Sequence, residues 1–176
     1  LENQHGGIKF DFQELEWSCE YYLKTGRMMP EDGLKILADC DSILLGAVGF
    51  PGVPDHVSLR DLLLPIRTGF DLYVNMRPIR LLPGLNSPLK DNRINFVVVR
   101  ENSGGVYTGM GGSVQQDTPD EVACQNWVYT RKQVDRCLKY AFELAAKRHT
   151  KKNPWRGLSE EDKKAGYTSQ LTLCGK

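Results

Sequence analysis

The first half of the chain alternates between short segments with the periodicity of a strand and segments with the periodicity of a helix. Apolar and polar residues alternate over residues 8–12, which predicts a short half-buried strand. The pattern over residues 17–25 is helical, and Gly26 follows where a left-handed C-cap is favoured. Residues 30–39 predict a second helix that begins with a proline in its first turn.

A continuous apolar run follows and is the clearest strand signal in this half. Residues 42–48 carry no charge, and such a run is typical of a strand covered on both faces. After a proline-rich loop, residues 58–69 predict a helix with Ser58 as its N-cap. Pro65 lies inside that helix and should bend it, because proline has no backbone N–H to donate.

The second half has a different composition. Residues 73–82 and 94–100 predict two strands joined by a turn region rich in proline, glycine and asparagine. Residues 101–112 hold too many glycines for a helix and predict an extended arm or hairpin. Residues 130–148 form a strongly amphipathic helical pattern, and residues 169–174 alternate again. Strands and helices in this order predict an α/β protein.

Charge and composition exclude several classes of protein. Of the 176 residues, 40% are apolar, and 23 basic against 22 acidic residues leave a net charge of +1. A nearly neutral chain has no broad basic surface, so we predict no nucleic-acid partner. No apolar run approaches the roughly 18 residues of a membrane helix, so we predict no membrane span. The five cysteines are widely spaced without a Cys-x-x-Cys pair, which favours reduced thiols and a cytoplasmic location over disulfides or zinc.

Three arginines and two proton-transfer candidates stand near the ends of the predicted elements. Arg67, Arg77 and Arg100 could converge on a small di- or tricarboxylate, because a guanidinium binds a carboxylate through two parallel hydrogen bonds. Tyr107 could donate a proton and Lys176 could accept one. The alternative is that these are ordinary surface arginines, a packing tyrosine and a solvated lysine. The residue types alone leave both interpretations open.

Longer motifs carry a resemblance to a known family. Four of them occur in order, Gly-Ala-Val-Gly-Phe-Pro (46–51), Pro-Asp-His-Val-Ser-Leu (54–59), Tyr-Val-Asn-Met-Arg-Pro-Ile-Arg (73–80) and Val-Arg-Glu-Asn-Ser-Gly-Gly-Val-Tyr (99–107). Together they resemble the β-decarboxylating 2-hydroxyacid dehydrogenases, the family of isocitrate and 3-isopropylmalate dehydrogenases. The resemblance covers residues 14–147 and resumes at residue 171. Three further stretches, at 17–22, 27–30 and 53–59, are similar to the tartrate and D-malate dehydrogenase branch.

The resemblance implies a role for each candidate residue. Arg67, Arg77 and Arg100 match the arginines that bind the substrate carboxylates. Tyr107 matches the tyrosine that protonates the enol after decarboxylation, and Lys176 matches the lysine that takes the hydroxyl proton in the partner subunit's active site. The implied reaction oxidises a small 2-hydroxy dicarboxylate with NAD, with Mg2+ or Mn2+ present, and releases CO2. The implied assembly is a homodimer with a shared active site.

The resemblance also implies an incomplete isocitrate/isopropylmalate dehydrogenase-like fold. The N-terminal strand and the C-terminal half of the large domain have no counterpart here, and neither do the metal-ligating aspartates and the adenosine loop. We therefore assign no metal ligand and no cofactor-binding residue. Residues 1–72 should be part of the large cofactor-binding domain. Residues 73–176 should be part of the small domain, with a dimerisation arm over about 103–129, and residues 148–170 should form a solvated insertion.

The substrate and the activity leave alternatives open. D-malate or tartrate is favoured, and 3-isopropylmalate is the alternative within the family. Arg60 stands where the isopropylmalate branch carries an acidic residue, which argues against that substrate. Leu62, Leu63 and Leu64 either line the substrate's third-carbon substituent or form the core of a helix. A different class of function is a truncated, inactive module that only dimerises.

Overall fold

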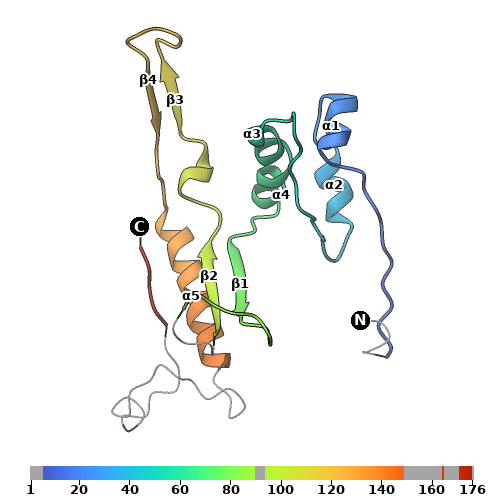
Figure 1. The fold of residues 1–176 in the computed structure, drawn as a ribbon, viewed down its shortest axis with the longest axis vertical. Helices are drawn as coiled ribbons and strands as arrows, with labels where there is room; N and C mark the ends of the chain where they lie inside the picture. Colours follow the sequence, from blue (N-terminus) through green and yellow to red (C-terminus); the bar gives the residue numbers. More distant parts are fainter. Residues whose placement is uncertain (1–5, 90–93, 149–163, 165–170, 176) are drawn as a thin grey trace. The chain divides into compact units, whose positions relative to one another are not determined.

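A computed structural model describes residues 6–89, 94–148, 164 and 171–175 (Figure 1). Its contacts divide the chain into two units, Leu1–Gly69 and Phe70–Lys176. The sequence placed a domain boundary after residue 72. The assignment of the two parts to a large and a small domain stays a prediction.

The two helices predicted at the start of the first unit are present. Helix α1 (Cys19–Thr25) ends at Gly26, whose φ of 75° is the left-handed C-cap conformation expected there. The Ser18 hydroxyl caps its other end by accepting from a backbone N–H at 3.4 Å. Helix α2 (Gly33–Ala38) begins three residues later than predicted, because the Pro30 carbonyl closes a preceding turn.

A helical segment of three parts completes the unit. It consists of α3 (Asp55–Ser58), the π-helical turn η1 (Leu59–Leu63) and α4 (Leu64–Gly69). The predicted N-cap at Ser58 is wrong, since the helix starts at Asp55, directly after a proline. Ser58 lies inside the helix, and its hydroxyl donates to the Asp55 carbonyl at 3.0 Å.

The π-helical turn explains how the helix accommodates Pro65. The Leu64 N–H donates to the carbonyl of Leu59, five residues earlier, instead of to the usual partner four residues earlier. Pro65 has no N–H, and in a regular helix its ring would collide with the carbonyl of residue 61. The structure thus shows a widened turn before Pro65, and the bend predicted there stays a prediction.

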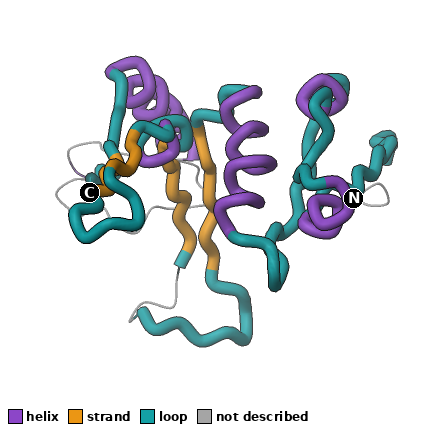
Figure 2. Tube along the Cα trace, turned by 90° about the horizontal axis from the view of Figure 1, so that it is seen from above, coloured by secondary structure: helices purple, strands orange, loops and turns teal. Residues whose placement is uncertain are grey.

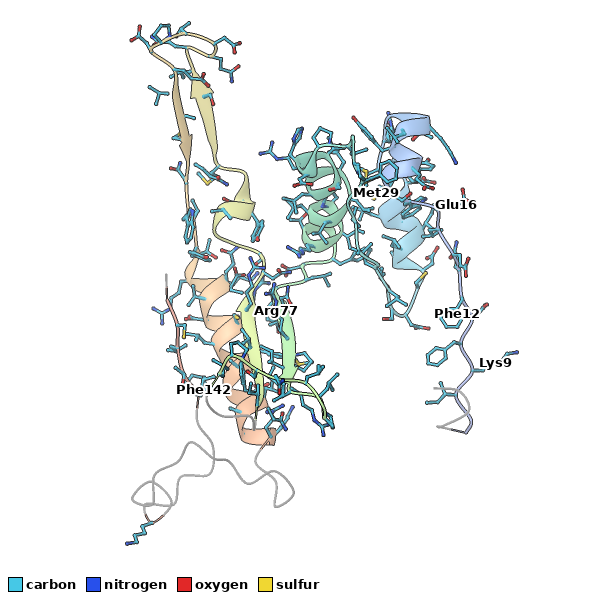
Figure 3. All side chains as sticks on the ribbon, viewed as in Figure 1. Lys9, Phe12, Glu16, Met29, Arg77 and Phe142 are labelled. Carbon is cyan, nitrogen blue, oxygen red and sulfur yellow. The ribbon has the colours of Figure 1, made fainter. Side chains whose placement is uncertain are left out.

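The two strands predicted for this unit do not form. Residues 8–12 and 42–48 have no strand assignment, and the described part of the unit holds only the isolated bridge Phe50–Val53. The side chain of Phe12 is 73% exposed on its segment (Figure 3), and Leu44 is 94% exposed. A strand needs a neighbour to satisfy its N–H and C=O groups, and the described residues of this unit provide none.

The apolar core of the first unit lies under its helices. Met28 and Leu62 are almost fully buried, with 0% and 1% exposure. The other buried apolar side chains of the unit are Cys19, Leu37, Val53 and Ile66. The helices therefore meet through their own apolar faces, without a sheet.

The second unit is built on an antiparallel pair of strands. Strands β1 (Val74–Arg80) and β2 (Asn95–Glu101) lie where the sequence predicts them and run side by side, as the long orange strands of Figure 2. Val74 pairs with Glu101 and Arg80 with Asn95. Directly paired residues project to the same face, so this register decides which side chains share a surface.

Helix α5 (Arg131–Arg148) covers one face of this pair and confirms the predicted amphipathic helix. Its buried residues are Cys137 and Ala141, and the Tyr140 hydroxyl donates to the Met76 sulfur at 3.6 Å. The face of the pair that carries Met76 and its partner Val99 is therefore the one turned towards α5.

The glycine-rich segment 101–112, predicted as an extended arm or hairpin, leads into a hairpin that lies mostly beyond it. After the short 3-10 helix η2 (Val106–Thr108), strands β3 (Gly111–Val114) and β4 (Val122–Gln125) pair antiparallel (Figure 1). All eight hairpin residues are exposed. Residues 171–175 are described but form no strand, contrary to prediction. Of the insertion predicted at 148–170, Arg148 ends α5 and residue 164 is described; the remainder and Lys176 lie outside the described residues.

Candidate active site

Two of the predicted arginines share one face of the β1–β2 pair. Arg77 lies opposite Val98, and Arg100 lies opposite Asn75. The two arginines are therefore diagonal neighbours, a relation that places side chains about 7–8 Å apart, within reach of long residues. Because Arg77 alternates with Met76, which contacts α5, this face is the one turned away from α5; Figure 3 labels Arg77. The strand register thus creates a doubly cationic surface.

Tyr107 meets Arg100 directly. The Arg100 Nη2 donates to the Tyr107 hydroxyl oxygen at 2.7 Å, and its guanidinium carbon lies 5.0 Å from the ring centroid. Both side chains are half-buried. The tyrosine oxygen accepts this hydrogen bond, so its own O–H proton is directed to a different atom. This arrangement places a proton donor beside a carboxylate-binding group.

Asn75 is a site residue that sequence reasoning missed. Its side-chain oxygen accepts a hydrogen bond from the Arg77 Nε at 3.2 Å, and it lies opposite Arg100 in the register. It therefore orients one arginine while facing the other. The two-residue period of a strand was the available signal, because it places Asn75 and Arg77 on the same face.

The other predicted site residues belong elsewhere in the chain. Arg67 lies in the last turn of α4, in the first unit, and is half-buried. Its convergence with the two strand arginines stays a prediction, as does the role of Lys176. Leu62 is 1% exposed and belongs to the helix core, while Leu63 and Leu64 are half-buried and Arg60 is exposed.

The electrostatics of the second unit centre on a different arginine. A hydrogen bond from Arg136 lowers the pKa of the Asp71 carboxyl below its usual 3.8, and the same bond raises the pKa of Arg136. Burial raises the pKa of the Cys137 thiol. Within the described ranges, no three His, Cys, Asp or Glu residues gather closely enough to hold a metal ion. None of the helices described there is long and apolar enough to cross a membrane.

The site and the fold define an α/β protein with a cationic surface that suits a carboxylate, and comparison with known proteins agrees. The family model described as "Isocitrate/isopropylmalate dehydrogenase" matches residues 1–155. The chain belongs to the isocitrate/isopropylmalate dehydrogenase family. This confirms the family that the motifs indicated.

The relatives lie in the branch that the sequence indicated. The chain is 50% identical over 148 residues to a probable tartrate dehydrogenase/decarboxylase of Bacillus subtilis, covering 83% of this chain and 42% of the relative. It is 50% identical over 150 residues to the decarboxylating D-malate dehydrogenase of Escherichia coli, covering 82% and 42%. A tartrate dehydrogenase/decarboxylase of Pseudomonas putida is 48% identical, covering 82% and 41%. The chain thus spans less than half the length of these relatives.

Solved structures support the same fold. The chain matches a crystal structure of isocitrate dehydrogenase from Methylococcus capsulatus with a TM-score of 0.67 at 25% identity, over 80% of this chain and 40% of that one. It also matches the TT0538 protein of Thermus thermophilus with a TM-score of 0.57 at 26% identity, over 72% and 24%. The predicted fold class, an isocitrate dehydrogenase-like α/β fold represented in part, is confirmed.

Proposed function

We propose that this chain contributes to the NAD-dependent oxidative decarboxylation of a small 2-hydroxy dicarboxylate, D-malate or tartrate, in the cytoplasm. The observation that carries the proposal is the shared face of Arg77 and Arg100, with the Tyr107 hydroxyl 2.7 Å from the Arg100 Nη2. Relatives named for tartrate and D-malate, at 48–50% identity, support the substrate class. Membership of the family supports the reaction type.

Each residue has a definite task in this reaction. Arg77 and Arg100 bind carboxylates of the diacid from the strand face, and Arg67 adds a third guanidinium from α4. Lys176, supplied to the partner subunit, takes the proton of the 2-hydroxyl. Holding a dianionic substrate at fixed points places its reacting carbons before chemistry starts.

The reaction then proceeds in two stages. NAD, when bound, would accept the hydrogen of the second carbon as a hydride, while Lys176 takes the hydroxyl proton and a 2-keto acid forms. The bond to the 3-carboxylate breaks next, CO2 departs, and the electron pair remains as an enolate. Tyr107 protonates the carbon that lost the carboxylate. The family also implies Mg2+ or Mn2+, but the described residues do not supply a ligand set, so ion dependence is left to the assay.

An NADH assay on the purified chain tests the proposal. We expect NADH from D-malate or tartrate with NAD and Mg2+ or Mn2+, and little from 3-isopropylmalate. Arg100→Met should abolish the rate and the calorimetric binding of the diacid. Arg131→Met is the matched control, because the Arg131 side chain is 91% exposed and pairs with Asp135 on its own helix. Equal binding of the diacid by Arg100→Met and Arg131→Met would contradict the assignment of Arg100 to the substrate site.

A second candidate function is an inactive dimerising module. The observation that favours it is the β3–β4 hairpin, which lies inside the predicted arm at about 103–129 and is exposed along its length. If the chain elutes as a homodimer, binds no diacid and makes no NADH, this function replaces the dehydrogenase proposal. If the protein instead prefers 3-isopropylmalate, the proposed substrate is 3-isopropylmalate and not D-malate or tartrate.

A further inference from the structure

We propose that Arg136 of α5 is a positioning residue, which fixes the loop between Arg100 and Tyr107 so that the tyrosine hydroxyl meets the arginine. This inference rests on the proposed function for the roles of Arg100 and Tyr107. The shape of the loop and its dependence on Arg136 can be measured without any activity.

Arg136 is anchored at the start of β1. Its two terminal nitrogens bind the two oxygens of Asp71 at 2.5 and 2.8 Å, and its guanidinium stacks over the Tyr73 ring at 4.5 Å. The Arg136 side chain is 21% exposed. A two-point bond and a stacked ring together hold the guanidinium plane in one orientation.

From this anchor Arg136 reaches the loop that follows β2. Its Nη2 also donates to the Ser103 hydroxyl oxygen at 3.0 Å, and that hydroxyl donates to the Glu101 carboxylate. The N–H groups of Ser103 and Gly104 donate to the same carboxylate at 2.9 and 2.8 Å. Glu101 directly follows Arg100, so the tight turn after the site arginine is fixed through Ser103 by Arg136.

The rest of the loop transmits this shape to Tyr107. The Gly105 N–H donates to the Val128 carbonyl at 2.8 Å, and the φ of Gly105 is 72°. A Cβ on Gly104 or Gly105 would lie 2.8 or 2.6 Å from Tyr129, so the loop passes tightly over that side chain. The short helix η2, which carries Tyr107, starts directly afterwards. The path from the site arginine to the site tyrosine is therefore constrained at successive residues.

Backbone strain and unpaired groups in the same cluster also point to function. Asp71 has a φ of 47°, a conformation that non-glycine residues adopt at a cost. Within the described chain, Arg136 Nε and Asn102 Oδ1 are buried without a hydrogen-bond partner. Such costs persist where the surrounding structure imposes them, and they concentrate at functional sites.

Hydrogen exchange on the purified chain tests the positioning role directly. Ser103→Ala removes the bond from Arg136 to the loop together with the bond from the Ser103 hydroxyl to Glu101. Arg136→Met removes every contact of Arg136, whereas Arg136→Lys keeps the charge but not the two-point bond. We expect amides 101–108 to exchange about 10-fold faster in Ser103→Ala and Arg136→Met, with Arg136→Lys between these and the wild type. Exchange in the centre of β1 should be unchanged in Ser103→Ala.

Kinetics separate a positioning role from a purely structural one. With an active protein, Arg136→Met should lower kcat by up to about 100-fold, because misplacement of a reacting group by about 1 Å has that effect. Its KM should change less, and Arg136→Lys should restore part of kcat. Arg131→Met, on the same helix, should alter neither constant.

The exchange experiment tests the positioning role of Arg136, and the binding and NADH assays test the proposed function. Unchanged exchange at 101–108 in Ser103→Ala overturns the positioning role, even if Arg136→Met fails to fold. If exchange becomes faster by the same factor in every segment of a variant, the positioning role is also overturned, because the whole unit has then lost stability. A wild type that binds no diacid and makes no NADH overturns the proposed function, while the exchange result still decides whether Arg136 shapes the loop.

Discussion

Replacement of Leu62 by alanine tests whether this leucine belongs to the core of its helix or lines the third-carbon substituent of the substrate. Leu62 is 1% exposed, so Leu62→Ala removes three buried carbons. At about 0.8 kcal/mol for each, the transfer term alone is about 2.4 kcal/mol. The cavity left behind adds to it, since buried Leu→Ala changes cost about 2–5 kcal/mol. We therefore expect the free energy of unfolding of the first unit to fall by about 2.5–4 kcal/mol.

Urea unfolding followed by Trp17 fluorescence measures this change. Trp17 packs where α2 begins, since a Cβ on Gly33 would lie 3.4 Å from its ring, so it reports on the first unit. The other two tryptophans, Trp127 and Trp155, would be replaced by phenylalanine in every variant.

Leu44→Ala makes the same chemical change at a side chain that is 94% exposed, and it should alter the free energy of unfolding by no more than about 0.5 kcal/mol. A loss below about 1 kcal/mol for Leu62→Ala, together with a changed preference among hydroxy diacids, would refute the core assignment and place Leu62 at the substrate.

Three further predictions concern the second unit. The arginine partner on α5 lowers the pKa of Asp71, so the ionised carboxylate adds stability that is complete above about pH 4 and is lost as the pH falls through the lowered pKa. Asp71 is 66% exposed, so Asp71→Asn should remove less than about 1 kcal/mol of this acid-dependent stability. An equal fall of the free energy of unfolding with pH in the wild type and in Asp71→Asn would contradict the bond. Gly105→Ala should destabilise the unit by about 1–3 kcal/mol in thermal unfolding, and Gly109→Ala, with φ of 71° but open space around it, should cost less. In the native chain, iodoacetamide should modify buried Cys137 far more slowly than exposed Cys124, and equal rates by mass spectrometry would rule this out.

The sequence predicted correctly those helices, strands and caps that are determined by residues near one another in the chain. The left-handed cap at Gly26, the amphipathic helix α5 and the strands β1 and β2 depend on residues close in the chain or on a strong period, and all are present. The strands at 8–12 and 42–48 failed for the opposite reason. An apolar run predicts burial, but burial also requires a covering neighbour, and no local pattern reveals whether one is present.

The candidate site was predictable in its residue types but not in its connections. Arg77, Arg100 and Tyr107 stand out by their residue type near the ends of predicted elements and by the family motifs that contain them. The register then shows that the two arginines share a face. Asn75 and Arg136 were missed. Arg136 bonds to residues 33 and 65 positions away, and nothing in a run of helix residues marks such a contact in advance.

The π-helical turn η1 sets the angular phase between the two ends of the helix that contains it. A regular α-helix advances by about 100° per residue, and the widened turn holds one residue more than a regular turn would. If the same residues formed a regular α-helix, Arg67 would be rotated by roughly that angle relative to Asp55, whereas a one-residue deletion at the wide turn would leave it in phase. A change of the wide turn to a regular one at constant length would therefore redirect a charged side chain without any change to the residues beside it.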